Sequence, residues 1–116
     1  MKKTTERRLK ENEIIFREAN QNIQKFIEET TGKLTSVFRF YCECSNQSCR
    51  EKITMTPAQY KAAQKTNRQF VVLPGHENPK IEKVTKSTAC FYKIEKFGEM
   101  PEENALSIAL TRLARE

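Results

Sequence analysis

Apolar positions recur at helical spacing along the first part of the chain. Between residues 5 and 30 the apolar side chains fall three, four or seven positions apart, and no proline or glycine interrupts them. This period is that of one helix face, and Gly32 stands where helices commonly end. We predict one long helix that either wraps around the body or projects from it. Its predicted core-facing stripe consists of Leu9, Phe16, Ala19, Ile23, Phe26 and Ile27.

The middle of the chain changes to strand-like patterns. Residues 34–43 are rich in aromatic and β-branched side chains, and alternation places Phe38, Phe40 and Cys42 on one face. A short helix over about residues 56–65 has the clearest start in the chain, because Thr56 can cap it, Pro57 suits its first position and Gln59 can reach back. The other predicted strands are 51–55, 69–73, 80–87 and 89–97, with a turn at 86–88.

The last segment is again helical. Glu102 and Glu103 suit the first turn of a helix over residues 102–115, and the amphipathic face consists of Leu106, Ala109, Leu110 and Leu113. Strands in succession with helices at the ends predict an α+β fold with a small antiparallel sheet, a long N-terminal helix, a short middle helix and a C-terminal helix. We divide the chain into an N-terminal helix (1–33), a body (34–97) and a C-terminal helix or tail (98–116).

Composition excludes several classes of protein. The 116 residues include no aspartate and only three glycines, which argues against an EF-hand calcium loop and a glycine-rich phosphate loop. No apolar run is long enough for a membrane span, and the N-terminal Met-Lys-Lys is not followed by the apolar stretch of a secretory signal. We therefore expect a cytoplasmic protein without membrane contact. The net charge of +6 is concentrated in residues 36–98, and the tail is mildly acidic.

The cysteines provide the strongest chemical signal. Cys42, Cys44 and Cys49 form a Cys-x-Cys-x4-Cys motif on a predicted strand and the polar turn after it. Zn²⁺ takes four ligands of this kind, and a body of this size commonly needs a metal or disulfides. We predict a structural Zn²⁺ site. Its fourth ligand is His76, the only histidine, or alternatively Cys90, which lies in a predicted strand. Disulfides and free thiols are the competing interpretations.

The cysteine motif is one of several short motifs along the chain. Quoted in chain order, the residues are Asn12-Glu13-x-x-Phe16-Arg17-Glu18-x-Asn20-x-x-Ile23, Phe40-x-Cys42-x-Cys44-x4-Cys49-x-Glu51, Tyr60, Phe70-Val71-Val72-x-Pro74-Gly75-His76-Glu77 and Ile81-Glu82-x-Val84. Over residues 7–97 the chain resembles a family of small uncharacterised bacterial proteins common in actinobacteria. That family has no established activity, so the resemblance implies no function. It implies that the Pro-Gly-His element belongs with the cysteines, which favours His76; Cys90 matches none of its motif positions.

Three functions are compatible with these features. The first is a non-enzymatic, regulatory zinc module that binds nucleic acid or a nucleoprotein complex through its basic body, namely through Arg68, Lys80, Lys83, Lys86, Lys93 and Lys96. The second is a protein-interaction adaptor that uses the terminal helices, with a recognition surface formed by Asn12, Glu13, Arg17 and Asn20. The competing interpretation of these four residues, which general considerations favour, is a solvated helix face with a salt bridge. The third is a zinc hydrolase, which needs an open coordination position. No deaminase signature or catalytic triad is present.

Overall fold

The computed structural model describes residues 3–46, 48–98, 100–101 and 104–115. The α+β fold is confirmed, with the long N-terminal, short middle and C-terminal helices in their predicted places. Several strands are shorter than predicted, and the turn between the last two lies at residues 88–91 instead of 86–88. The elements are α1 (Lys3–Thr30), β1 (Phe38–Tyr41), β2 (Lys52–Met55), α2 (Pro57–Ala63), β3 (Gln69–Val72), β4 (Glu82–Ser87), β5 (Tyr92–Lys96) and α3 (Ala105–Arg115).

The strands form two antiparallel sheets. One is the β1–β2 pair, and the other has the order β3-β5-β4. The two sheets meet where the backbone N–H of Glu43 donates to the carbonyl of Val71 over 2.9 Å. The predicted start of α2 is confirmed, because Thr56 and Gln59 form a reciprocal capping box.

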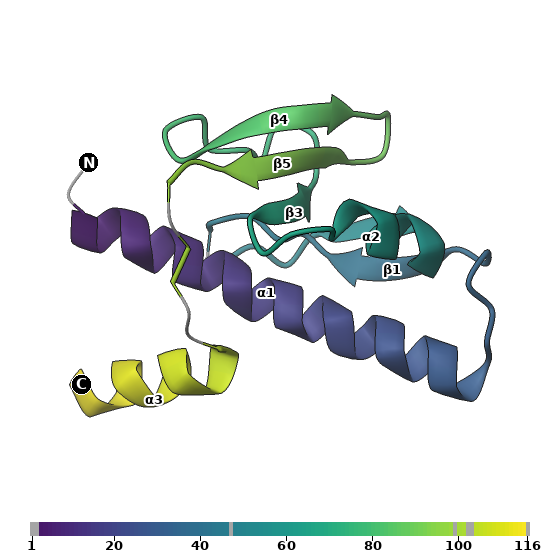
Figure 1. The fold of residues 1–116 in the computed structure, drawn as a ribbon, viewed down its shortest axis with the longest axis horizontal. Coiled ribbons are helices and arrows are strands. Elements are labelled where there is room, and N and C mark those ends of the chain that lie inside the picture. The colour runs from purple at the N-terminus through teal and green to yellow at the C-terminus, as the bar shows by residue number, and fades with distance from the viewer. Residues whose placement is uncertain (1–2, 47, 99, 102–103, 116) are drawn as a thin grey trace.

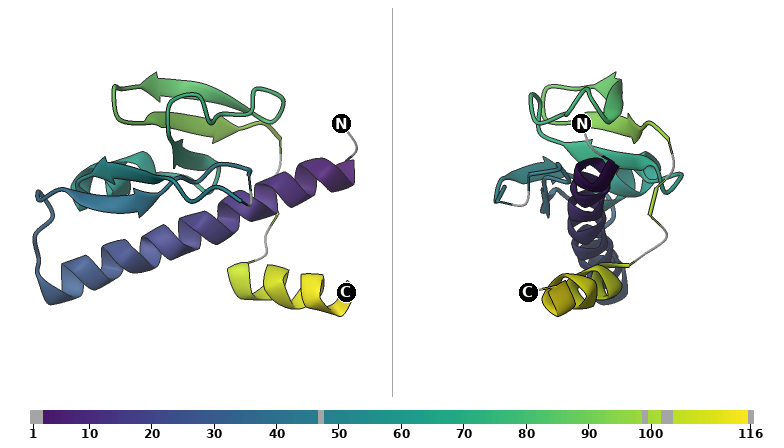
Figure 2. Two further views of the ribbon diagram at one scale, coloured as in Figure 1. Left: turned by 180° about the vertical axis from the view of Figure 1, so that it is seen from behind. Right: turned by 90° about the vertical axis from the view of Figure 1, so that its left-hand side faces the viewer.

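Helix α1 runs between the strands and α3. Both sheets and α2 lie on one side of it, and α3 packs on the other side, near its N-terminal half (Figure 1, Figure 2). One apolar core contains Ile14 and Ile27 of α1, Ile108 of α3 and the inner side chains of the strands. Among the described residues, no helix combines the length and apolar character needed to cross a bilayer.

The predicted apolar stripe of α1 is only partly buried. Ile27 belongs to the core and Ile23 packs against it, whereas Phe26 is 66% exposed. The helix also buries a stripe of polar side chains beside Ile14: Lys10, Asn12, Glu13 and Asn20. Each of these side chains has a polar partner elsewhere in the chain. Burial therefore leaves none of their polar groups without a partner.

The second correction concerns Lys96, which was predicted to bind nucleic acid. Its side chain is buried and cannot contact nucleic acid. Its ammonium pairs with the carboxylates of Glu13 on α1 and Glu82 on β4, and all three side chains are inaccessible to solvent. Burial lowers the pKa of Lys96 to about 8, against the opposing effect of Glu13. The triad joins α1 to both strands of the hairpin β4–β5. We refer to it as the buried triad.

The buried triad gives a pH-dependent stability. Burial raises the pKa of Glu13 from 4.5 to about 8, although the Lys96 ammonium opposes the rise. The folded protein therefore keeps a proton that the unfolded chain releases, and stability falls as the pH rises from about 5 to 8. Glu13→Gln removes this titration. Over that pH range we expect the free energy of unfolding to fall by about 3 kcal/mol less in the variant than in the wild type.

Denaturant titrations of metal-saturated wild type and E13Q at several pH values measure this difference. Comparing the two proteins cancels the titration of groups that do not contact Glu13, including Glu43, whose pKa burial raises to about 7. Parallel pH profiles for the two proteins would show that Glu13 does not hold this proton.

The predicted amphipathic face of α3 is exposed. Leu106, Leu110 and Leu113 are 69%, 58% and 67% exposed, whereas Ile108 is buried. Asn104 caps the helix by accepting from the N–H of Ser107 over 2.8 Å, and Glu18 of α1 accepts from the N–H of Ala105. Glu102 and Glu103 lie outside the described residues.

Candidate metal centre

Three thiols and one imidazole converge at the junction of the two sheets. The ligand atoms of Cys42, Cys44, Cys49 and His76 all lie within 4.8 Å of one another. His76 Nδ1 is 3.5 Å from the sulfur of Cys42 and 3.7 Å from that of Cys49. Cys42 and Cys44 follow β1, Cys49 precedes β2, and His76 follows β3. The site therefore ties the end of one sheet to the end of the other.

Two turns bring the donors together. Asn46 forms the first, because its side-chain oxygen accepts from the N–H of Ser48 over 3.0 Å and its carbonyl accepts from the N–H of Cys49 over 3.0 Å. This turn returns Cys49 towards Cys42 and Cys44. The second turn is closed by the N–H of His76, which donates to the carbonyl of Leu73 over 3.0 Å. Gly75 has φ +89° there, a conformation that favours glycine.

The donors fit a tetrahedral metal ion. Bonds of about 2.3 Å to sulfur and about 2.0 Å to nitrogen place a tetrahedral thiolate and imidazole roughly 3.6 Å apart. The two measured separations, 3.5 and 3.7 Å, match that value. All three cysteines are buried, whereas His76 lies nearer the surface. The residues can thus hold a metal ion as four protein ligands.

The pKa values of the clustered thiols are shifted in opposite directions. Hydrogen bonding with Cys42, the largest cause, lowers the pKa of Cys44 to about 5, against the opposing effect of burial. The same contact raises the pKa of Cys42. The N–H of Leu73 donates to the Cys42 sulfur over 3.3 Å, which stabilises a thiolate at that position. Deprotonated thiols are the form that binds metal.

Cys90, the alternative fourth ligand, lies elsewhere. The structure places it in the turn between β4 and β5, not within a strand as predicted, and its side chain is exposed. The strand β5 begins later than predicted because Thr88 closes a turn: its hydroxyl accepts from the N–H groups of Cys90 and Phe91. Cys90 is not among the residues of the cysteine–histidine cluster.

A buried carboxylate supports the metal-binding segment, and the sequence interpretation did not include it. Glu43 stands between Cys42 and Cys44, so strand alternation turns its side chain away from them. Its oxygens accept from Asn20, Tyr60, Gln64 and the N–H of Val71. The signal was available in the sequence, because an acid between two inward-facing cysteines on an extended strand must face a different layer of the protein.

The four residues predicted as a partner-binding surface instead make contacts within the protein. Asn20 accepts from the N–H of Tyr41 over 2.7 Å and donates to its carbonyl over 2.8 Å, and Asn12 donates to the carbonyl of Ser45 over 2.8 Å. Glu13 belongs to the buried triad, and Arg17 lies 4.3 Å over the Phe70 ring. Three of the four are buried, because this face of α1 covers the cysteine segment and the sheets.

The residues predicted to bind nucleic acid divide into three groups. Lys80, Lys83 and Lys86 are exposed, on β4 or just before it, and Lys93 is half-buried on β5. Arg68 donates from Nε and Nη2 to the carbonyl of Lys96, which holds its guanidinium against the sheet. Lys96 is buried. The neighbouring aromatic residue Phe91 is also buried, and Tyr92 is half-buried.

Comparison with protein-family models, with curated proteins and with solved structures finds no match to this chain.

Proposed function

We propose that this protein is a small zinc-stabilised, non-enzymatic module that binds nucleic acid through exposed lysines on β4 and just before it. The convergence of Cys42, Cys44, Cys49 and His76 within 4.8 Å carries the proposal. Three thiolates and one imidazole in a tetrahedron are a ligand set typical of structural zinc. Four protein ligands fill that coordination, which favours a structural ion over the open site that a zinc hydrolase needs.

Thiol alkylation tests the metal site. In the metal-bound protein we expect iodoacetamide to modify Cys90 alone, because its thiol is exposed while the other three are buried and metal-bound. After a chelator removes the ion, we expect all four cysteines to react. Intact-mass spectrometry counts the modifications. Cys90→Ser is the matched control, with no modification before chelation and three after it. Modification of all four cysteines without chelator is incompatible with the proposed site.

Unpaired lysines support nucleic-acid binding. No described residue forms an ion pair with the ammonium groups of Lys80, Lys83, Lys86 or Lys93. Phosphate groups release counterions when they bind such lysines, so the affinity for nucleic acid depends on salt. We define the hairpin surface as Lys80, Lys83 and Lys86, the exposed members of this set.

Salt dependence tests the hairpin surface. With a single-stranded oligonucleotide, the double variant Lys80→Gln and Lys83→Gln should reduce the slope of log affinity against log salt by about 1.4, from about 0.7 for each phosphate contact. Fluorescence anisotropy over a range of salt concentrations measures the slope. The control variant K25Q/K33Q changes one lysine in α1 and one just after it. It loses the same charge and should keep the wild-type slope. Salt-independent binding by the wild type would exclude this surface.

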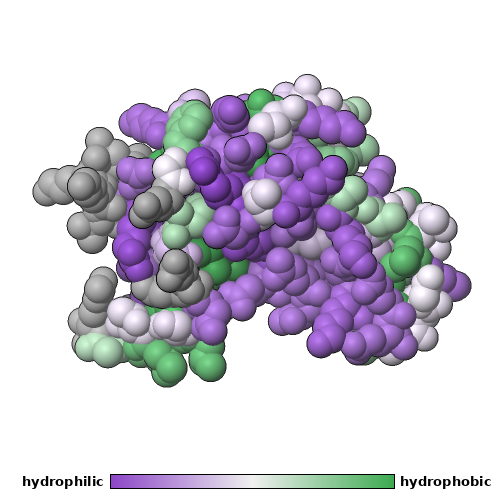
Figure 3. All heavy atoms as spheres, viewed as in Figure 1, coloured by the Kyte–Doolittle hydropathy of each residue, from purple (hydrophilic) through white to green (hydrophobic). Residues whose placement is uncertain are grey.

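A protein contact at α3 is the second candidate function. Figure 3 shows apolar side chains gathered along the exposed edge of the C-terminal helix, and its outer leucines are 58% to 69% exposed. An amphipathic helix with such a face suits the groove of a partner protein. Recovery of a stoichiometric protein partner that stays bound after nuclease treatment would favour this adaptor function over nucleic-acid binding.

A further inference from the structure

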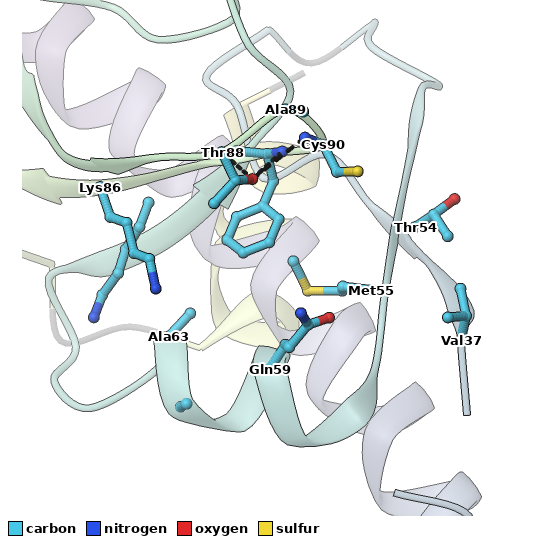
Figure 4. A pocket seen from close by; sticks show the side chains of 12 residues that line it. Val37, Thr54, Met55, Gln59, Ala63, Lys86, Thr88, Ala89 and Cys90 are labelled. Carbon is cyan, nitrogen blue, oxygen red and sulfur yellow. Dashed lines mark hydrogen bonds between the residues drawn. The ribbon is translucent and has the colours of Figure 1, made fainter. Parts of the chain in front are cut away.

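A second concave site lies between the two sheets, apart from the metal centre. It is a pocket of about 440 Å³ bounded by the β4–β5 turn, α2 and the β1–β2 pair (Figure 4). We call it the intersheet pocket. Lys86 lies at one end and Cys90 at the other, with Gln59 and Ala63 of α2 along one wall (Figure 4). Its volume lies within the range of about 300–1,000 Å³ that small-molecule sites occupy.

The lining of the intersheet pocket is mainly apolar. Met55, Ala63 and Phe91 are buried members of the core that also line the pocket. Thr88 fixes one wall, because its N–H donates to the carbonyl of Phe91 over 2.9 Å and its hydroxyl donates to the same carbonyl over 2.8 Å. An apolar floor with a few polar groups at its rim is the usual composition of a small-molecule site.

A β-bulge places two lysines opposite each other at the pocket. Val84 pairs with Ile94, but the next pair is Lys86 with Lys93, so Thr85 is an extra residue in β4. Without this bulge Thr85 would stand opposite Lys93, and Lys86 would lie on the other face of the sheet. Both Lys86 and Lys93 line the pocket. Bulges commonly redirect a side chain next to a functional site.

The lysine pair is not explained by the stability of the hairpin. Like charges directly opposite each other on neighbouring strands are destabilising. No described residue forms an ion pair with either ammonium group. Glu95, two residues along β5, is instead opposite Lys83. A bound anion would relieve the repulsion between Lys86 and Lys93 and supply the missing counter-charge.

We propose that the intersheet pocket binds a small molecule that has an apolar body and one anionic head group. The head group lies between Lys86 and Lys93, and the body packs against Met55, Ala63 and Phe91. This inference goes beyond the proposed function and requires neither zinc as the bound ion nor nucleic acid as the partner.

Anilinonaphthalene sulfonate is a suitable probe, because it combines an apolar aromatic body with one anionic group. Fluorescence titration of the metal-bound full chain should show one probe molecule per chain, and amide chemical shifts should change at the pocket lining. Lys86→Gln with Lys93→Gln should weaken binding at least about tenfold, since two charge-assisted contacts are lost. The control K80Q/K83Q removes the same charge outside the pocket and should keep the affinity within about twofold.

Ala62→Tyr provides a second, independent test. Ala62 is an exposed residue of α2 that lines the pocket, so a tyrosine there fills the space without entering the core. We expect it to abolish probe binding and to leave oligonucleotide binding unchanged, whereas K80Q/K83Q should weaken the oligonucleotide alone. Equal effects of the two double variants on the probe, unchanged binding by A62Y, or shifts confined to α3 would each overturn the pocket proposal. Circular dichroism confirms that each variant is folded.

Discussion

The Cys44→Ser variant is expected to bind no stoichiometric metal and to lose the folded body. Cys44 is buried among the other donors, and its thiol has the lowest pKa of the cluster, about 5. A structural zinc ion contributes an apparent 10–16 kcal/mol to folding in zinc-finger peptides, roughly as much as the whole stability of a small domain. Loss of one ligand therefore removes most of the driving force for joining the two sheets.

Elemental analysis and circular dichroism of freshly purified, reduced protein measure the result. Cys90→Ser is the matched control, because it removes a thiol that lies outside the cluster. It should retain one equivalent of zinc and the wild-type melting temperature. If C44S and C90S carry the same metal content and melt together, the cysteine cluster is not a metal centre.

Lys96→Met is expected to cost about 3–5 kcal/mol at neutral pH, because it leaves the buried carboxyl groups of Glu13 and Glu82 without the ammonium group that pairs with them. Denaturant unfolding at neutral pH measures this cost.

Lys83→Met is the comparison for this variant. It removes the same charge from an exposed position on β4, where no described carboxylate pairs with it, and should change stability by less than about 0.5 kcal/mol. A cost for K96M as small as that for K83M would mean that the buried triad contributes nothing to the fold.

Local chemistry explains what the sequence predicted. The capping box of Thr56 and Gln59 acts within one turn, so α2 began where its residues indicated. The spacing of Cys42, Cys44 and Cys49 identified three of the candidate ligands, because a strand and a short turn bring those thiols together. His76 followed from its turn and from a resemblance, and the geometry now places it with the cysteines.

Long-range pairing explains what the sequence did not predict. Periodicity assigns apolar side chains to the core, yet Glu13 and Asn20 are buried because Lys96 and the backbone of Tyr41 provide their partners. Those partners are remote in the chain, so no local pattern reveals them. The bulge at Thr85 is similarly invisible, because it appears only when β4 is aligned with β5.

The pairing of α1 with distant segments also has a consequence for synthesis on the ribosome. Helix α1 is made before the strands, but Glu13 has no cation until Lys96 has left the ribosome. The metal ligands are complete earlier, once His76 has left the ribosome. The ion can therefore join the cysteine segment to β3 while the growing chain still lacks β5, and Asn12 and Asn20 can dock before Glu13 does. A cell short of the metal would release chains in which α1 has a polar stripe and no folded body to cover it.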